Sequence, residues 1–195
     1  MRIFVHFTER NGDSMSKVYV LLADGFEEVE GLTVVDLLRR AGVEVRTVSI
    51  KQDVSVMGSH KINVIADTTL DYIHGDADMV VLPGGLTGTN NLKNSAEVDE
   101  LIRRFDKEGK YLAAVCAAPT VYGEKGLLKG KKATCYPGME DGLVGAEWTE
   151  DSVAVDGNYI TSRGLGTSID FALKLVELLV SKDKADEIAH KIVYR

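Results

Sequence analysis

The sequence predicts an α/β fold, built on a mainly parallel sheet with helices on both faces. Short apolar runs of strand length alternate along the chain with longer stretches whose apolar residues recur at helical spacing. The strand runs are apolar throughout, as expected for strands buried on both sides of a parallel sheet. Loops rich in glycine or small residues follow three strands, at the edge where such sheets form sites: they span 23–27, 83–88 and 116–119.

The expected strands are short and most end in turn-forming residues. An apolar run over 17–22 and an alternating run over 43–50 predict the first two strands. Gly58-Ser59 lies between two short runs, which predicts a hairpin that pairs 54–57 with 61–65. A buried run over 79–82 ends in Pro83-Gly84-Gly85. The remaining strands are predicted at 111–115, 132–135, 153–155 and 159–161.

The helices are expected from apolar spacing and from the residues that begin or end them. A helix over 27–41 carries Val34, Leu37 and Ala41 on one face and closes at Gly42, and an amphipathic helix over 96–108 closes at Gly109. Thr167-Ser-Ile-Asp170 resembles a capping box, which predicts a helix that runs to about Val180. A final short helix is expected over 183–193.

The chain length of 195 residues suits one domain with a full core. Residues 9–14 are polar, and Met15-Ser-Lys17 resembles a second start directly before a strand. We therefore expect residues 1–14 to form an N-terminal extension outside the core, and residues 15–195 to form a single domain. The alternative is an edge strand over 2–8.

The net charge and the composition limit the kinds of partner that the protein can bind. The net charge of -7 disfavours nucleic acid and anionic membrane surfaces, and no apolar stretch is long enough to span a bilayer. Two cysteines are too few for a disulfide framework, and the first residues lack the pattern of a secretory signal. We therefore expect a protein of the reducing cytoplasm, with no nucleic-acid or membrane partner.

Cys116 is the first candidate for chemistry. The run 111–115 ends at this cysteine, two alanines follow, and Pro119 could open a helix. This arrangement matches a strand–turn–helix elbow, in which small residues two positions before and after the nucleophile allow a tight turn. A helix N-terminus beside the thiol would lower its pKa, so the pattern predicts a nucleophilic or redox-active cysteine. The alternative is an inert buried thiol.

An acidic residue early in the first helix is the second candidate. Glu30 lines up with Val34, Leu37 and Ala41, so it can face inward, where burial raises a carboxyl pKa. It can equally be a solvated acid that favours the helix dipole. Glu27 occupies a similar side of the helix, and spacing does not choose between the two acids.

Backbone donors are the third candidate feature. Gly84 and Gly85 follow a strand, where N–H groups can converge on an anion or a developing oxyanion, and the N–H of Ala117 would be a further donor. A plain tight turn is the alternative. Cysteine and histidine show no metal-ligand spacing, so no metal is expected, and chemistry at a nucleophilic thiol needs no cofactor. Cys135 is interpreted as strand filling, and His74 is the histidine best placed to reach the thiol.

With these residues in view, the chain resembles the DJ-1/ThiJ/PfpI family, and its DJ-1/ThiJ-like branch most closely. The resemblance runs from about residue 17 to the C-terminus, and it is carried by segments 20–30, 36–42, 80–85, 113–119 and 161–167. It implies a flavodoxin-like three-layer sandwich that forms a homodimer. It also implies that Cys116 is the reactive cysteine, that Glu30 is its protonated partner, and that Gly85 and Ala117 belong to the oxyanion site.

Two departures from the family pattern concern histidine. The protease-like branch has a histidine directly after the nucleophile, where this chain has Ala117. Some members have a histidine before the proline of the next strand's loop, where this chain has Tyr136 before Pro137. The sequence therefore favours a mechanism in which Glu30 moves the proton.

The resemblance implies a stress-response function. The leading hypothesis is a cysteine-dependent enzyme that acts on small α-oxoaldehydes or on glycated protein, as a glutathione-independent glyoxalase or deglycase. The second hypothesis is a non-enzymatic redox sensor or chaperone, in which Cys116 is oxidised. A low thiol pKa is expected in both cases. The third hypothesis, an amidotransferase-like or peptidase hydrolase, needs a histidine beside Cys116.

Overall fold

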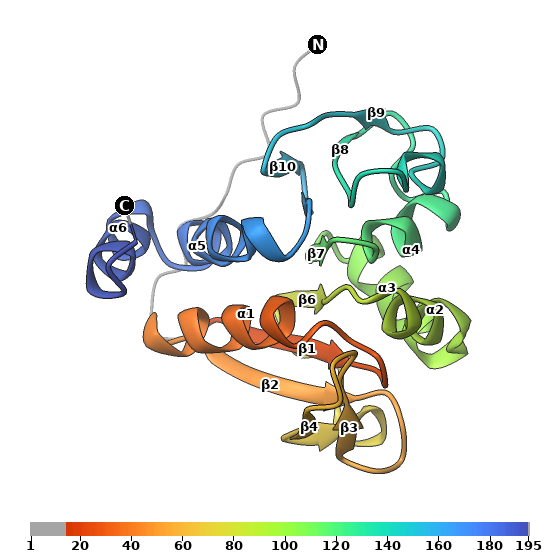
Figure 1. Cartoon of the computed structure of the whole chain (residues 1–195), viewed down its shortest axis with the longest axis horizontal. Helices are drawn as coiled ribbons and strands as arrows, with labels where there is room; N and C mark the ends of the chain where they lie inside the picture. The colour runs from red at the N-terminus through yellow and green to blue at the C-terminus, as the bar shows by residue number, and fades with distance from the viewer. Residues whose placement is uncertain (1–14, 195) are drawn as a thin grey trace.

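The computed structural model describes residues 15–194, so the predicted extension over 1–14 lies outside the described residues. Within the described residues, the central sheet has seven strands in the order β10-β11-β7-β6-β1-β2-β5 (Figure 1). Its paired strands run parallel except β10, which pairs antiparallel with β11. The strands are β1 (Lys17–Leu22), β2 (Glu44–Ser49), β5 (Thr68–Thr69), β6 (Met79–Leu82), β7 (Tyr111–Val115), β10 (Val153–Asp156) and β11 (Tyr159–Ser162). This arrangement confirms the predicted α/β class.

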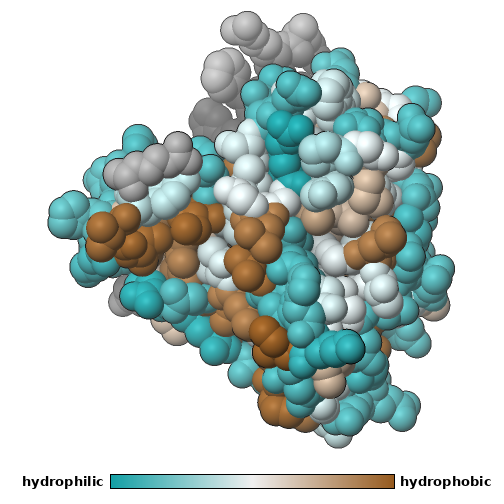
Figure 2. Space-filling model, viewed as in Figure 1, coloured by the Kyte–Doolittle hydropathy of each residue, from teal (hydrophilic) through white to brown (hydrophobic). Residues whose placement is uncertain are grey.

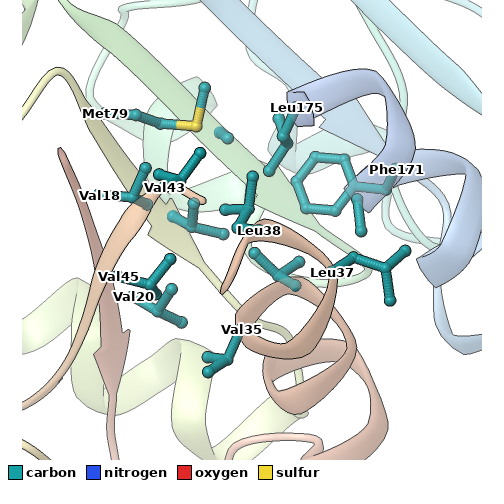
Figure 3. Close-up of a cluster of buried hydrophobic side chains, with 14 of the residues drawn as sticks. Val18, Val20, Val35, Leu37, Leu38, Val43, Val45, Met79, Phe171 and Leu175 are labelled. Atoms are coloured by element: carbon teal, nitrogen blue, oxygen red, sulfur yellow. The ribbon is translucent and has the colours of Figure 1, made fainter. Parts of the chain in front are cut away.

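Helices cover both faces of the sheet, which gives the three layers of the flavodoxin-like sandwich (Figure 1). One layer contains α1 (Glu28–Arg40), α5 (Ser168–Leu179) and α6 (Lys182–Lys191), and the other contains α2 (Leu86–Asn94), α3 (Ala96–Lys107) and α4 (Pro119–Glu124). Because side chains alternate along a strand, β1 points Val18 and Val20 to the first layer and Tyr19 and Leu21 to the second. Figure 3 shows the first of these two cores, between α1, α5 and the sheet.

The strand register brings three loops together at one edge of the sheet. Leu82 pairs with Ala114, and Val115 pairs with Ser162, so β6, β7 and β11 end side by side. The residues that follow these strands are Pro83-Gly84-Gly85, Cys116 and Arg163-Gly164. The parallel register therefore assembles the candidate site at the carboxyl ends of the strands.

A small hairpin lies outside the main sheet. β3 (Ser55–Met57) and β4 (Asn63–Ile65) pair antiparallel, as predicted, and form a separate two-stranded sheet. Its turn contacts the start of α1, where the N–H of Ser59 donates to the carbonyl of Phe26 at 2.8 Å. The hairpin thus fixes the entry of the helix that carries Glu30.

Several predicted elements differ from the structure. Helix α2 was not predicted, because its sequence contains Gly88 and three asparagines, which are poor helix formers. The strand expected over 132–135 is reduced to β8 (Lys132–Ala133), which pairs with the unpredicted β9 (Glu147–Trp148). The short strand β5 was also missed. The prediction of a capping box at Thr167 is wrong, since the Thr167 hydroxyl hydrogen-bonds to Gly164 and Ser162 and does not cap α5.

None of the described helices has the length and apolar composition needed to cross a membrane.

Candidate functional site

Cys116 lies in the turn between β7 and α4. Its φ is 65°, a left-handed conformation that is uncommon for a residue with a side chain. Hydrogen bonds hold this backbone on both sides: the Cys116 N–H donates to the carbonyl of Ser162 at 3.0 Å, and the Cys116 carbonyl accepts from the N–H of Tyr136 at 2.7 Å. Pro119 then opens α4, as predicted. The strained turn presents the half-buried thiol at the edge of the sheet.

Gly84 connects the thiol to the carboxyl group. The Gly84 N–H donates to Oε2 of Glu30 at 2.9 Å, and a Cβ added at Gly84 would lie 2.5 Å from both this oxygen and Cβ of Cys116. Only glycine therefore fits between the two side chains. Gly84 was predicted as an oxyanion donor together with Gly85 and Ala117, but its N–H is already committed to Glu30.

Glu30 is the acid that reaches the thiol. It lies in the first turn of α1 with 1% of its surface exposed, and it shares a hydrogen bond with the Cys116 side chain. Burial raises the pKa of Glu30 to about 7, and the charge of Glu27 adds to this, while the hydrogen bonds from Cys116 and Gly84 oppose it. The solvated position that the sequence left open is therefore wrong for Glu30.

Glu27, the other candidate acid, does not contact the thiol and instead lies at the start of α1. It is the N-cap of α1, where its Oε1 accepts from the N–H of Val29 at 3.3 Å. Its Oε2 accepts from the Ser59 hydroxyl at 3.0 Å, which turns the side chain toward the hairpin. The hydrogen bonds separate two acids that sequence spacing could not.

The thiol pKa differs from the expectation. Burial, together with the charge of Glu30 and its hydrogen bond, raises the pKa of Cys116 to about 12, although the N–H groups of Gly85 and Ala117 lower it. A second negative charge beside an ionised Glu30 is unfavourable, so at neutral to alkaline pH the pair holds one proton, for which the carboxyl and the thiol compete.

Two further residues at the site were not predicted as parts of it. A Cβ added at Gly164 would lie 3.8 Å from Oε1 of Glu30 and 3.4 Å from the ring of Tyr136, so the loop after β11 closes the site beside the carboxyl. Gly164 follows a strand, as Gly84 does, and that position was the available signal. Tyr136 was noted only as the replacement of a histidine.

The histidines do not contact the thiol in the described part of the chain. Neither His60, His74 nor His190 hydrogen-bonds to Cys116 or Glu30, and His6 lies outside the described residues. The suggestion that His74 approaches Cys116 is therefore not supported. Cys135 is buried in the core of the other layer, as predicted, but it follows β8 and is not part of a strand.

One group of side chains in residues 15–194 has the spacing that a metal ion would need. The ligand atoms of Glu27, Glu28 and His60 lie within 4.8 Å of one another. These atoms already hydrogen-bond with Ser59 and with each other, so we assign no metal to them.

Comparison with known proteins agrees with this architecture. A family model described as the DJ-1/PfpI family matches residues 16–178. DJ-1 homolog B of Arabidopsis thaliana is 40% identical over 93% of this chain, and the chain spans 42% of that longer protein. The protein dj-1beta of Drosophila melanogaster is 43% identical over 90% of this chain and 96% of its own length.

Solved structures and a more distant relative extend the comparison. The crystal structure of Drosophila DJ-1beta covers 93% of this chain with a TM-score of 0.90. A protein of Pyrococcus abyssi that is named a deglycase is 34% identical over 84% of this chain and 99% of its own length. The matched length, the level of identity and the shared fold lead to one conclusion: this chain belongs to the DJ-1/PfpI family.

Proposed function

We propose that this chain is a cysteine-dependent stress-response protein that acts on reactive α-oxoaldehydes or early glycation adducts. The observation that carries the proposal is a buried carboxyl, hydrogen-bonded to a thiol on a strained turn, with a pKa raised to about 7. A carboxyl with a pKa near neutrality can take the proton of the thiol and pass it on. The deglycase name of the Pyrococcus relative supports the same substrate class.

The proposed reaction with methylglyoxal needs no external oxidant. The Cys116 thiolate forms a bond to the aldehyde carbon, and the carbonyl electron pair moves to oxygen, which takes the proton of Glu30. The resulting hemithioacetal transfers its carbon-bound hydrogen, with its electron pair, to the neighbouring ketone carbon, and its hydroxyl proton passes through Glu30 to the ketone oxygen. The aldehyde carbon is thereby oxidised to a thioester while the ketone carbon is reduced. Water then hydrolyses the thioester to lactate and frees the thiol. The N–H groups of Gly85 and Ala117 would stabilise developing charge.

The test measures lactate formed from methylglyoxal by the purified protein. We expect lactate from the wild type and from Cys135→Ser, which keeps Cys116, at a rate that rises with protein concentration. Cys116→Ser should form none, and Glu30→Gln should lose most of its turnover because it cannot move a proton. Equal turnover in the wild type and Cys116→Ser would refute the nucleophile, and equal turnover in Glu30→Gln would refute the proton shuttle.

The second candidate is a redox sensor or chaperone through oxidation of Cys116. The two backbone N–H groups that face the sulfur favour it, because they could also hold the oxygens of a sulfinate. In this case Cys116 of the Glu30→Gln variant should still be oxidised, since the glutamine amide can donate a hydrogen bond to the sulfinate. Oxidation without lactate formation would favour this function. A hydrolase is not proposed, because no imidazole contacts Cys116 in the described residues.

We also infer a homodimer, as the family resemblance implies. Apolar residues gather on the face over α1, α5 and α6 (Figure 2). Leu32 of α1 and Val180 at the end of α5 are exposed. Light scattering at micromolar concentration should give the mass of two chains, and the mass of one chain would contradict the inference. The cytoplasmic location stays a prediction.

A further inference from the structure

The turn of the β3–β4 hairpin holds two carboxylates at the start of α1. Glu28 is 4% exposed, and its Oε1 accepts from the His60 N–H at 2.8 Å. The Ser59 hydroxyl lies 3.0 Å from Oε2 of Glu27 and 3.1 Å from Oε2 of Glu28. Nδ1 of His60 lies 3.1 Å from Oε2 of Glu28 and 3.3 Å from Oε2 of Glu27. Two buried acids therefore share one hydroxyl and one imidazole.

The protons in this cluster are too few for every contact to be a hydrogen bond at once. The Ser59 hydroxyl has one proton and can donate it to Glu27, to Glu28 or to Nδ1 of His60, which lies 3.0 Å from the hydroxyl oxygen. When Nδ1 of His60 carries a proton, it donates a hydrogen bond to Glu28 instead. This hydrogen bond to Glu28, followed by the charges of Glu27 and Glu28, raises the pKa of His60. The His60 side chain is 71% exposed, so its proton exchanges directly with solvent.

Glu27 joins this cluster to the candidate site. Its N–H donates to the carbonyl of Gly84 at 2.9 Å, and the N–H of the same glycine donates to Glu30. The charge of Glu27 also acts on Glu30 and raises its pKa. The ionisable groups that act on Glu30 are Cys116, from the turn after β7, and Glu27, from its own helix. Those that act on His60 are Glu27 and Glu28, both from α1.

We propose that His60 is a positioning residue that controls, through Glu27, whether Glu30 keeps its proton beside Cys116. A protonated His60 neutralises much of the negative charge at Glu27, so less negative charge reaches Glu30 and its carboxyl releases the proton more easily. A neutral His60 leaves the charge of Glu27 uncompensated, and Glu30 keeps its proton to a higher pH. The exposed imidazole thus lowers the Glu30 pKa while it is protonated, and this effect is lost as the pH rises and His60 becomes neutral.

The experiment reads Glu30 directly and needs no turnover. Carboxyl-labelled glutamate in the Cys116→Ser protein is titrated by carbon NMR, and the signal that Glu30→Gln removes belongs to Glu30. Replacing His60 by glutamine, which is never cationic, should raise the Glu30 pKa by about half a unit or more, and Glu27→Gln should lower it by a similar amount. Lys61→Gln is the matched control, since it removes a charge from the same turn.

The role of His60 in catalysis rests on the proposed function, but the titration tests the effect of His60 on Glu30 separately from turnover. Shifts in opposite directions for His60→Gln and Glu27→Gln, with none for Lys61→Gln, would support it even if no lactate forms. If His60→Gln and Glu27→Gln both leave the Glu30 pKa equal to its value in Lys61→Gln, the inference is overturned even if the enzyme turns over. Circular dichroism and light scattering check that the fold and oligomeric state are unchanged. If His60→Gln disturbs them, His60→Asn, which is also never cationic, takes its place in the same titration.

Discussion

At the scale of single residues, the site depends on how one proton is held between Glu30 and Cys116. Both groups are largely buried and both have raised pKa values, to about 7 and about 12. The N–H groups of Gly85 and Ala117 favour charge on sulfur, whereas the N–H of Gly84 favours charge on the carboxylate. Backbone donors therefore influence which of the two atoms carries the charge.

Gly84→Ala should disable the site. The new Cβ would lie 2.5 Å from Oε2 of Glu30 and from Cβ of Cys116, so both side chains must move. We expect a loss of about 1–3 kcal/mol in the free energy of unfolding and about a hundredfold loss in the rate of thiol alkylation. The matched control is Gly166→Ala, where an added Cβ meets nothing within 4 Å. Equal alkylation rates in the two variants would contradict the packing argument.

The raised pKa of Glu30 also predicts how stability depends on pH. The folded-state pKa rises from 4.5 to about 7, so Glu30 stabilises the fold fully below pH 4.5, and this contribution is lost as the pH rises through 7. In a Cys116→Ser background, the unfolding free energy measured by denaturant should fall by up to about 3 kcal/mol over this range. Adding Glu30→Gln should remove that fall, and an unchanged pH dependence would refute the assignment.

At the scale of elements, capping and burial set how much each helix contributes to global stability. The Ser95 hydroxyl caps α3 by accepting from the N–H of Val98 at 3.2 Å, and the Ser181 hydroxyl caps α6 by accepting from the N–H of Lys184 at 3.1 Å. Helix α3 buries Val98, Leu101, Ile102 and Phe105, whereas α6 buries only Ala185 and Ile188 among its described residues. The two caps are alike, but the packing behind them differs.

This contrast predicts different effects for the same mutation. Ser95→Ala should lower the free energy of global unfolding by about 1 kcal/mol, because α3 unfolds only with the core. Ser181→Ala should instead increase hydrogen exchange within α6 and leave the global value nearly unchanged, because a lightly packed terminal helix can open locally. Denaturant unfolding and amide exchange on both variants measure the difference. Equal global losses would show that α6 unfolds together with the core.

At the scale of the whole molecule, the side chains of the two cysteines pack into different cores. Cys116 packs against the core shared with α1 and α5, whereas Cys135 lies in the core on the other face. The sequence contains no third cysteine. The side chains of Cys116 and Cys135 pack into different cores, so the backbone must move before the two can form a disulfide.

Oxidation should consequently stop at oxygen adducts of Cys116. With moderate peroxide we expect a gain of about 32 Da for a sulfinate, and no loss of about 2 Da for an internal disulfide. Intact mass spectrometry of the wild type and Cys135→Ser should give the same gain, while Cys116→Ser should give none. An internal disulfide in the folded wild type would contradict this separation of the cysteines.

The sequence by itself determined the α/β class and the position of Cys116. Continuous apolar runs, such as 79–82 and 111–115, have few alternatives to buried parallel strands, and the small residues around Cys116 suit a tight strand-to-helix turn. Helix α2 could not be predicted from the sequence, because residues such as Gly88 have a low helix propensity. In the folded chain Gly88 packs against residues 25–26, and this packing supports the helix.

Only the tertiary structure decided which acid meets the thiol and what its proton does. Glu27 and Glu30 lie on similar sides of α1, so helical spacing treats them alike. The hairpin turn binds Glu27 and the Gly84 backbone binds Glu30, and both contacts join segments that are far apart in the sequence. The thiol pKa depends on burial and on that neighbouring carboxyl, which are properties of the assembled site and not of a local sequence pattern.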